Sequence, residues 1–508
     1  MIAFESGAGR WVLGVAVLGS GMAFLDGTVV NVALPDIGRD LGASTSALQW
    51  VLNGYLLTLA SLILLGGSLG DRYGRRRIFV FGVVVFTGAS LLCAIAPSAG
   101  LLVAARLLQG IGGALLTPGS LAMIEASFRP SDRARAIGAW SGLGGVATAI
   151  GPLLGGYLVE AVSWRAIFLI NLPLGLLVAA MATRHVPETR DPTASGRLDY
   201  RGAVLAGLGL AGTTYALIEG PGKGMAGAVV LAGAGGVAAL VAFLLVERTS
   251  SNPMMPLGIF ASRQFSAANL VTFTVYAALG GVFFLLVAFL QISLGYSPIA
   301  AGAASLPVTA LMLLLSARSG ALAQRIGARI PLTIGPLVIA AGLLLMTRIE
   351  PGDSYVSSVL PAVIVFGLGL TLVVAPVTAT VLAAADARHS GIASGINNAV
   401  SRVGGLLAVA VLPLVAGLTG DAFYSPSAMT DGFHVAMTAC AGLSALGGVL
   451  AWLTISDDVL QAEADPEGDT PERLADDYMC PVSGAPLRPA REAECEARLA
   501  EGAAVTRS

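Results

Sequence analysis

The sequence predicts an all-α membrane protein with fourteen crossing helices, and three observations lead to this fold class. Of the 508 residues, 55% are hydrophobic and 12% are charged, whereas ordinary globular domains are about 45–50% apolar and about 25% charged. The mean hydropathy is +0.80. Apolar stretches of about 20 residues, the length that crosses a bilayer, recur along the chain. Helices are expected because a backbone in lipid must satisfy its own hydrogen bonds.

The apolar stretches divide the chain into fourteen expected spans. The first is longer than the roughly 7–15 residues of a signal-peptide core, so we expect it to be retained. The spans are expected near 12–34, 47–67, 78–96, 100–124, 136–159, 165–183, 202–219, 226–246, 267–291, 299–317, 330–347, 356–382, 392–416 and 434–454.

Basic residues predict the orientation of these spans. Nineteen arginines, with Arg388 and Arg402 included, are counted in the loops on the side of the N-terminus. The opposite side holds only Arg39, Arg165, Lys223 and Arg348. Positive loops stay in the cytoplasm, and an even number of spans puts both ends of the chain on one side. We therefore expect both termini in the cytoplasm of a multi-pass protein of the cell (inner) membrane.

The composition changes abruptly after Ile455. Residues 457–508 hold thirteen Asp and Glu against five Arg, so the rest of the chain carries a net positive charge. Such an acidic, proline-containing segment is typical of a disordered extension. We expect 456–508 to be a disordered acidic cytoplasmic tail, dispensable rather than regulatory.

The chain contains an internal duplication. The pattern G-x-L-x-x-R-x-G-x-R occurs at 67–76 and again at 320–329, an offset of 253 residues. A weaker echo pairs Gly110 with Gly367. Spans seven and eight have no counterpart. We expect a six-helix bundle at 1–190, an inserted two-helix hairpin with linkers at 191–262, and a second six-helix bundle at 263–455.

Two related bundles that face each other are typical of a transporter that alternates its access between the two sides of the membrane. No phosphate-binding GxxxxGK[ST] pattern, zinc pattern or paired catalytic carboxylates occur. We therefore expect no enzyme, no cofactor, no metal, no ATP and no nucleic-acid partner. Small molecules, protons and the lipid bilayer are the expected partners of a monomer.

Four motifs resemble the major facilitator superfamily, and in particular its fourteen-helix drug:proton antiporter branch. They are the loop 67–77, the span-four motif 106–112, the span-five motif 147–156, and the first-span signature 25–35 followed by Gln49, Trp50 and Tyr55. Ala147 stands where the span-five motif usually has glycine. The resemblance covers residues 10–455 and implies two pseudo-symmetric six-helix bundles with two inserted central helices.

Asp26 is the one carboxylate well inside an apolar span, and an acid in a membrane is a candidate functional group. Burial makes its neutral, protonated state accessible, so it can hold either a proton or a cation. Arg106 and Gln109 lie one turn apart on one helix face, and the resemblance associates Arg106 with proton coupling. The alternatives are a permanent Asp26–Arg106 structural pair and a packing role for the arginine.

The loop between spans two and three is expected to act as a conformational gate. Its glycines allow a tight turn, and its charged groups can pair across the bundles in one conformation only. The gate residues are Gly67, Asp71, Arg72, Gly74, Arg75 and Arg76. The alternative is a loop that only sets the topology. Its copy in the second half has Gln324 in place of the acid.

The glycines and proline of span five are expected to form a hinge or a tight seal, with ordinary helix packing as the alternative. They are Gly151, Pro152, Gly155 and Gly156. Further polar candidates for the substrate site are Asn53, Gln291, Asn397 and Asn398, each of which has a neighbouring helix as the alternative partner.

The resemblance implies proton-coupled efflux of hydrophobic or cationic small molecules. A metabolite exporter or importer of the same fold, a membrane receptor without transport activity and a polytopic membrane enzyme remain the alternatives. The substrate is not identified by the sequence.

Overall fold

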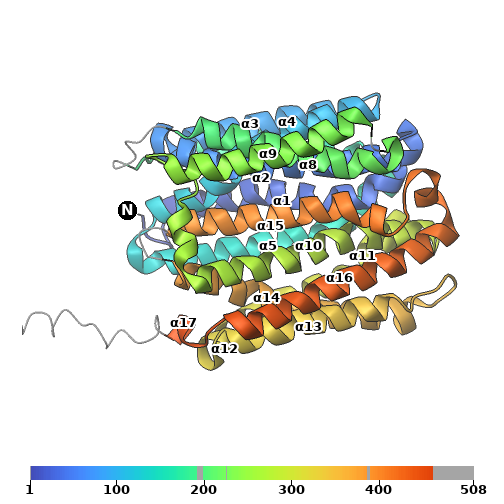
Figure 1. The fold of residues 1–508 in the computed structure, drawn as a ribbon. Helices are drawn as coiled ribbons and strands as arrows, with labels where there is room; N and C mark the ends of the chain where they lie inside the picture. Colours follow the sequence, from blue (N-terminus) through green and yellow to red (C-terminus); the bar gives the residue numbers. More distant parts are fainter. Residues whose placement is uncertain (1, 192–197, 225, 386–389, 462–508) are drawn as a thin grey trace, which may run out of the picture. The chain divides into compact units, whose positions relative to one another are not determined.

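A computed structural model describes residues 2–191, 198–224, 226–385 and 390–461, and helices account for most of this part of the chain. Figure 1 shows the helices lying side by side along one common direction. The helices of the first half are α1 Gly7–Leu41, α2 Thr45–Tyr73, α3 Arg75–Ala94, α4 Ala99–Ser127, α5 Pro130–Ala161, α6 Ala166–Leu169 and α7 Asn171–His185. They are followed by α8 Tyr200–Lys223 and α9 Gly227–Thr249.

The second half begins with the short helix η1 Leu257–Ala261. Its other elements are α10 Arg263–Ile292, α11 Pro298–Ala304, α12 Leu306–Ile326, α13 Arg329–Met346, η2 Tyr355–Val359, α14 Leu360–Ala383, α15 Ser390–Val415, η4 Gly420–Tyr424, α16 Pro426–Thr454 and α17 Asp458–Gln461.

Fourteen helical segments of the described chain are long and apolar enough to cross a membrane, and they coincide with the fourteen expected spans. Three of these segments combine two adjoining elements: α6 with α7, α11 with α12, and η2 with α14. The helices extend several residues beyond the expected boundaries, because polar residues at helix ends continue the helix outside the apolar core. The predicted fold class is confirmed.

The sequence sets the first helix boundary locally. Gly42 adopts a left-handed conformation with φ of 55° and ends α1, since glycine carries no Cβ that would clash there. Ser44 then caps α2, and its hydroxyl accepts a hydrogen bond from the backbone N–H of Ala47. The chain therefore reverses within three residues.

Each half packs mainly within itself, and the hairpin α8–α9 lies against both halves. The closest helix pairs in the first half include α2 with α4 and α3 with α4, and in the second half α13 with α14 and α10 with α16. Helix α8 contacts α2 of the first half and α15 of the second. The hairpin therefore covers a seam between the halves.

The internal duplication extends to backbone contacts. A Cβ added to Gly112 of α4 would lie 2.5 Å from the backbone nitrogen of Phe86 on α3. A Cβ added to Gly369 of α14 would lie 2.5 Å from the backbone nitrogen of Ile339 on α13. Phe86 and Ile339 are 253 residues apart, the offset of the loop motif. The same glycine-dependent approach of two helices therefore occurs once in each half.

The two repeated loops share a second feature. Gly74 and Gly327 both have positive φ, 113° and 87°, as glycine allows. A carboxylate from the end of each half covers the loop. Glu188 Oε1 accepts from the backbone N–H of Arg76 at 3.1 Å, and Asp457 Oδ1 accepts from that of Arg329 at 3.2 Å. Neither carboxylate was singled out from the sequence.

The structure corrects one part of the charge count. Arg402 was counted in a loop, but it lies well inside α15, twelve residues after the helix begins. The predicted acidic tail falls almost entirely at 462–508, outside the described residues, as do Cys480 and Cys495. Cys93 and Cys440 lie in apolar helices and are buried free thiols.

We expect Gly112→Ala and Gly369→Ala each to lower the melting temperature of the purified protein in detergent. The added methyl group has no space, and overpacking of this kind costs about 1–3 kcal/mol. Gly88→Ala is the matched control, because nothing lies within 4 Å of its added Cβ. Equal melting temperatures for all three variants would contradict the proposed close approach.

Candidate functional site

The carboxylate of Asp26 lies inside the first half, in a buried ion pair. Asp26 on α1 and Arg106 on α4 are each 1% exposed, and Arg106 Nη1 donates to Asp26 Oδ2 at 2.5 Å. Gln109, three residues after Arg106, donates through Nε2 to the other carboxylate oxygen at 2.8 Å. The structure thus brings together the three residues that the sequence placed at the centre of the site.

A second layer of groups holds this trio. Arg106 also donates to Gln109 Oε1 at 2.6 Å and, through Nε, to the carbonyl oxygen of Val51 at 2.9 Å. Gln109 Nε2 also donates to the hydroxyl of Ser90 on α3 at 2.9 Å. The guanidinium carbon of Arg106 lies 4.5 Å from the ring centre of Tyr55. Each donor to Asp26 therefore has a second acceptor.

These second acceptors decide what the site can do chemically. A buried ion pair is costly to break because one charge is left without its partner. If Asp26 takes up a proton, however, Arg106 keeps Gln109 Oε1, Val51 and the face of Tyr55, and Gln109 keeps Ser90. Each of the two groups that donate to Asp26 therefore has at least one hydrogen bond that does not depend on the carboxylate.

The sequence analysis missed Ser90 and Asn171 at this site. Asn171, at the start of α7, donates through Nδ2 to Ser90 Oγ at 3.2 Å and is fully buried. The only sequence signal was a small polar residue in each of two apolar spans, which is common in membrane helices. Their role depends on how α3 and α7 are rotated against α4.

The other predicted polar residues lie elsewhere. Gln291 near the end of α10 donates to the carbonyl oxygen of Val32 on α1 at 2.9 Å, so it joins the two halves. Asn397 on α15 donates to Thr272 Oγ1 at 2.9 Å and to Asn269 Oδ1 at 3.2 Å, both on α10. Its bonds are made within the second half.

Asn53 is fully buried on α2, and neither of its amide atoms has a hydrogen-bond partner in the described part of the chain. It lies between Trp50 and Leu57, residues that pack near α8, and it is not part of the Asp26 network. Asn398 is exposed and donates to the carbonyl oxygen of Ser394 on its own helix.

We call the helix ends that carry Arg75, Arg76 and Arg129 the arginine-rich end, and those that carry Arg39 and Arg165 the arginine-poor end. At the arginine-rich end, Arg75 pairs with Asp71 at 2.7 Å and also donates to the carbonyl oxygen of Ala122.

Arg76 donates to the carbonyl oxygen of Val186 at 2.9 Å, and its guanidinium lies 3.6 Å from Glu188. These contacts of Asp71, Arg75 and Arg76 are made within the first half. Gly74 supplies the turn, and Gly67 lies beside Pro118 of α4.

The span-five motif forms close helix contacts. A Cβ added to Gly155 would lie 3.2 Å from the carbonyl oxygen of Val29 on α1, and one added to Gly151 would clash with Thr28. On another face, a Cβ added to Gly156 would clash with Pro298 of α11, and one added to Gly302 would clash with the carbonyl group of Pro152. Helix α5 therefore packs closely against α1 of its own half and against α11 of the second half.

Direct hydrogen bonds join the halves at the arginine-poor end. Gln49 of α2 donates to the carbonyl oxygen of Val409 on α15 at 2.7 Å. Tyr424 Oη donates to the carbonyl oxygen of Ala43 at 2.6 Å, and Thr45 Oγ1 donates to that of Gly420 at 2.9 Å. Together with Gln291 and Gly156, these contacts hold the two halves together at this end of the molecule.

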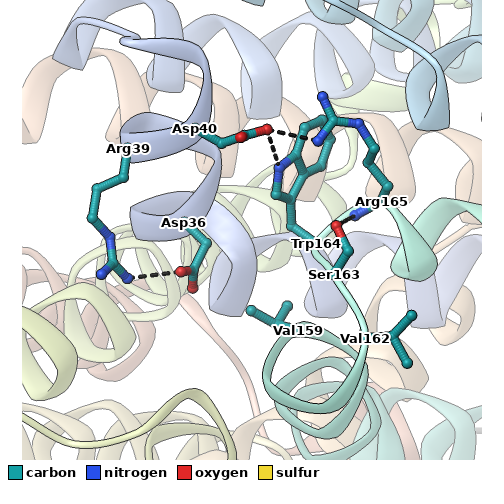
Figure 2. Close-up of a pocket in the computed structure, with 8 residues that line it drawn as sticks. All are labelled: Asp36, Arg39, Asp40, Val159, Val162, Ser163, Trp164 and Arg165. Carbon is teal, nitrogen blue, oxygen red and sulfur yellow. Dashed lines mark hydrogen bonds and ion pairs between the residues drawn. The ribbon is translucent and has the colours of Figure 1, made fainter.

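A small polar pocket opens at the same end, between α1 and the loop after α5 (Figure 2). There Asp40 accepts from Arg165 at 2.6 Å and from the indole N–H of Trp164 at 2.9 Å, and Arg39 pairs with Asp36 at 2.7 Å. Acids thus pair with Arg39 and Arg165, two of the basic residues of the arginine-poor end.

Comparisons with known proteins agree with this architecture. A family model described as the Major Facilitator Superfamily matches residues 16–409. A puromycin resistance protein of Streptomyces alboniger is 38% identical over 88% of this chain and 91% of its own. The multidrug resistance protein Stp of Mycobacterium tuberculosis (strain CDC 1551 / Oshkosh) is 38% identical over 78% of this chain and 73% of its own.

Among solved structures, a bacterial homologue of the human lysosomal transporter Spinster, in an inward-facing and unoccupied conformation, has a similar fold. The TM-score is 0.65 at 18% sequence identity, with 90% of this chain and 99% of that chain covered. The fourteen spans, the paired halves and the matched family model lead to one assignment. The chain belongs to the major facilitator superfamily and is a multi-pass membrane transporter of small molecules.

Proposed function

We propose that the chain exports hydrophobic small molecules, drugs among them, in exchange for protons. The buried network of Asp26, Arg106 and Gln109 carries this proposal, because it offers one proton-binding carboxylate whose donors keep other acceptors when it is neutralised. The names of the relatives, a puromycin resistance protein and a multidrug resistance protein, support drugs as the cargo.

The proposed coupling runs through the contact between α1 and α4. When Asp26 is charged, its ion pair with Arg106 holds the two helices together in a medium of low dielectric. Proton uptake removes that attraction while the remaining hydrogen bonds of Arg106 stay in place. We propose that this change in α1–α4 attraction biases the two halves between their alternative positions.

We further propose that both termini are cytoplasmic, so that the arginine-poor end, where hydrogen bonds join the halves, faces outward. In this structure Asp71, Arg75 and Arg76 have partners within the first half. The loop would serve as a gate if these charges exchange their partners for groups of the second half when the arginine-rich end closes.

Expression of the chain in a drug-sensitive bacterium is expected to raise the inhibitory concentrations of several chemically distinct hydrophobic antibiotics. The Asp26→Asn variant at equal membrane abundance serves as the control. If the chain raised resistance to none of the antibiotics but exported a single metabolite, metabolite transport would replace drug efflux as the proposed function.

In proteoliposomes, Asp26→Asn is expected to abolish export driven by a pH gradient but to retain substrate exchange at equal pH. The amide cannot release a proton, yet it has nearly the same size. Removal of one partner of a buried pair costs about 3–5 kcal/mol, so the melting temperature is measured in parallel.

The double variant Asp26→Asn with Arg106→Gln supplies the matched control, because it leaves no unpaired charge. If Asp26 were only a structural partner of Arg106, this double variant would regain gradient-driven export. Retention of gradient-driven export by the single variant would equally contradict the proton-carrier role.

The orientation is testable with single cysteines in a background that lacks the four native ones. Ser354→Cys lies in an exposed loop at the arginine-poor end, and Ser251→Cys lies in an exposed loop at the arginine-rich end. We expect a membrane-impermeant maleimide to label the first in intact cells and the second only in inverted vesicles. The opposite labelling pattern would reverse the proposed topology.

A further inference from the structure

Arg402 is an intramembrane cation that the Asp26 network does not include. It lies twelve residues after the start of α15, and at about 1.5 Å per residue this places it about 18 Å along the helix. A hydrocarbon core is about 30 Å thick, so Arg402 lies near its middle. Charged residues at that depth are costly and are typical of functional positions.

The contacts of α15 show which of its faces lie against α2 and which lie against α10. Towards α2, Gly395 lies beside Leu64, and Val409 accepts the hydrogen bond from Gln49. Towards α10, Asn397 bonds to Thr272, and Gly404 lies beside the carbonyl oxygen of Phe273.

At 100° per residue, Arg402 falls on the side of α15 that faces α2, and Asn398 lies about 40° from it in the direction of the α10 face. Helix α2 belongs to the first half and α10 to the second. Asn398 is exposed and Arg402 is half-buried, so neither side chain is fully covered by the neighbouring helices.

Arg402 has no hydrogen bond or ion pair among the described residues, and its Nε is buried without a partner. Its guanidinium lies within electrostatic range of the phenol groups of Tyr55 on α2 and Tyr276 on α10, one from each half. By contrast, Arg106, Arg75 and Arg165 are each paired with a carboxylate.

The nearby acid is not available to Arg402 in this state. Both oxygens of Asp26 are occupied, one by Arg106 and the other by Gln109. A guanidinium in a low-dielectric space requires an anion or several acceptors. Its planar fork of N–H donors fits a carboxylate in particular.

We propose that Arg402 binds an acidic group of the transported molecule, a carboxylate or an ionised phenol, between α2 and α10. This inference rests on the proposed export function and narrows its substrate class from hydrophobic small molecules in general to hydrophobic acids. Asn398, one turn from Arg402 along α15, supplies an amide that can bond to the same group.

The test uses three anthracene compounds that share one ring system and differ in charge. They are 9-anthracenecarboxylic acid, its carboxamide and 9-(aminomethyl)anthracene, which are anionic, neutral and cationic at neutral pH. Binding to the purified full-length protein is measured by the quenching of tryptophan fluorescence.

We expect the acid to bind at least about tenfold more tightly than the carboxamide, since hydrogen bonds to charged groups are the stronger ones. The amine is expected to bind most weakly. Arg402→Gln is expected to remove the preference for the acid without changing carboxamide binding, and Arg402→Lys to keep part of it.

Arg318→Gln is the matched control, because Arg318 is an exposed arginine of α12 that donates only to a carbonyl group of its own helix. It is expected to bind all three compounds as the parent does. Arg402→Gln is also expected to melt at or above the parent temperature, because it removes a charge that has no partner.

An unchanged acid preference in Arg402→Gln would overturn the inference, as would equal binding of acid and amine, or no acid binding, by the parent. Export of the neutral carboxamide is measured separately in proteoliposomes with a pH gradient. Gradient-driven carboxamide export without an acid preference refutes the Arg402 site alone. An Arg402-dependent acid preference without gradient-driven export of any of the three compounds refutes the proposed function instead.

Discussion

The ion pair between Asp26 and Arg106 is the interaction on which the rest of this structure depends. Two opposite charges lie where water is excluded, so every other polar group near them has to complete their hydrogen bonds. Gln109, Ser90 and the carbonyl group of Val51 do so from three helices. Because each donor has two acceptors, the pair is held firmly.

The duplicated halves keep the same scaffold but carry different charges. The glycine contacts at Gly112 and Gly369 recur, and so do the carboxylates that cover the two repeated loops. The first half holds a balanced pair at Asp26 and Arg106, whereas the second presents the unpaired Arg402. The two halves thus share their close helix contacts but differ in the charged residues that they hold inside the membrane.

The spans could be predicted from the length of the apolar stretches, and the duplication from the repeated motifs. The trio of Asp26, Arg106 and Gln109 could be predicted because the sequence alone shows a single acid within an apolar span. The hydrogen-bond partners of the polar side chains could not be predicted, because they depend on how each helix is rotated about its axis. For Gln291 the sequence left substrate and a neighbouring helix open as partners, and the structure shows a bond to Val32 of the other half. Arg402 was missed because a charge count treats every arginine near a loop alike, although this one lies deep within its helix.

The hairpin α8–α9 constrains how the halves can move. Its contact with α2 includes a hydrogen bond from the indole of Trp50 to Glu219, 3.2 Å long, whereas its contact with α15 is made by apolar side chains such as Leu210 and Leu406. Apolar surfaces slide past one another more readily than a directional bond bends. Helices α8 and α9 would therefore move together with the first half. Helix α15 would slide along their apolar surface when the halves change position.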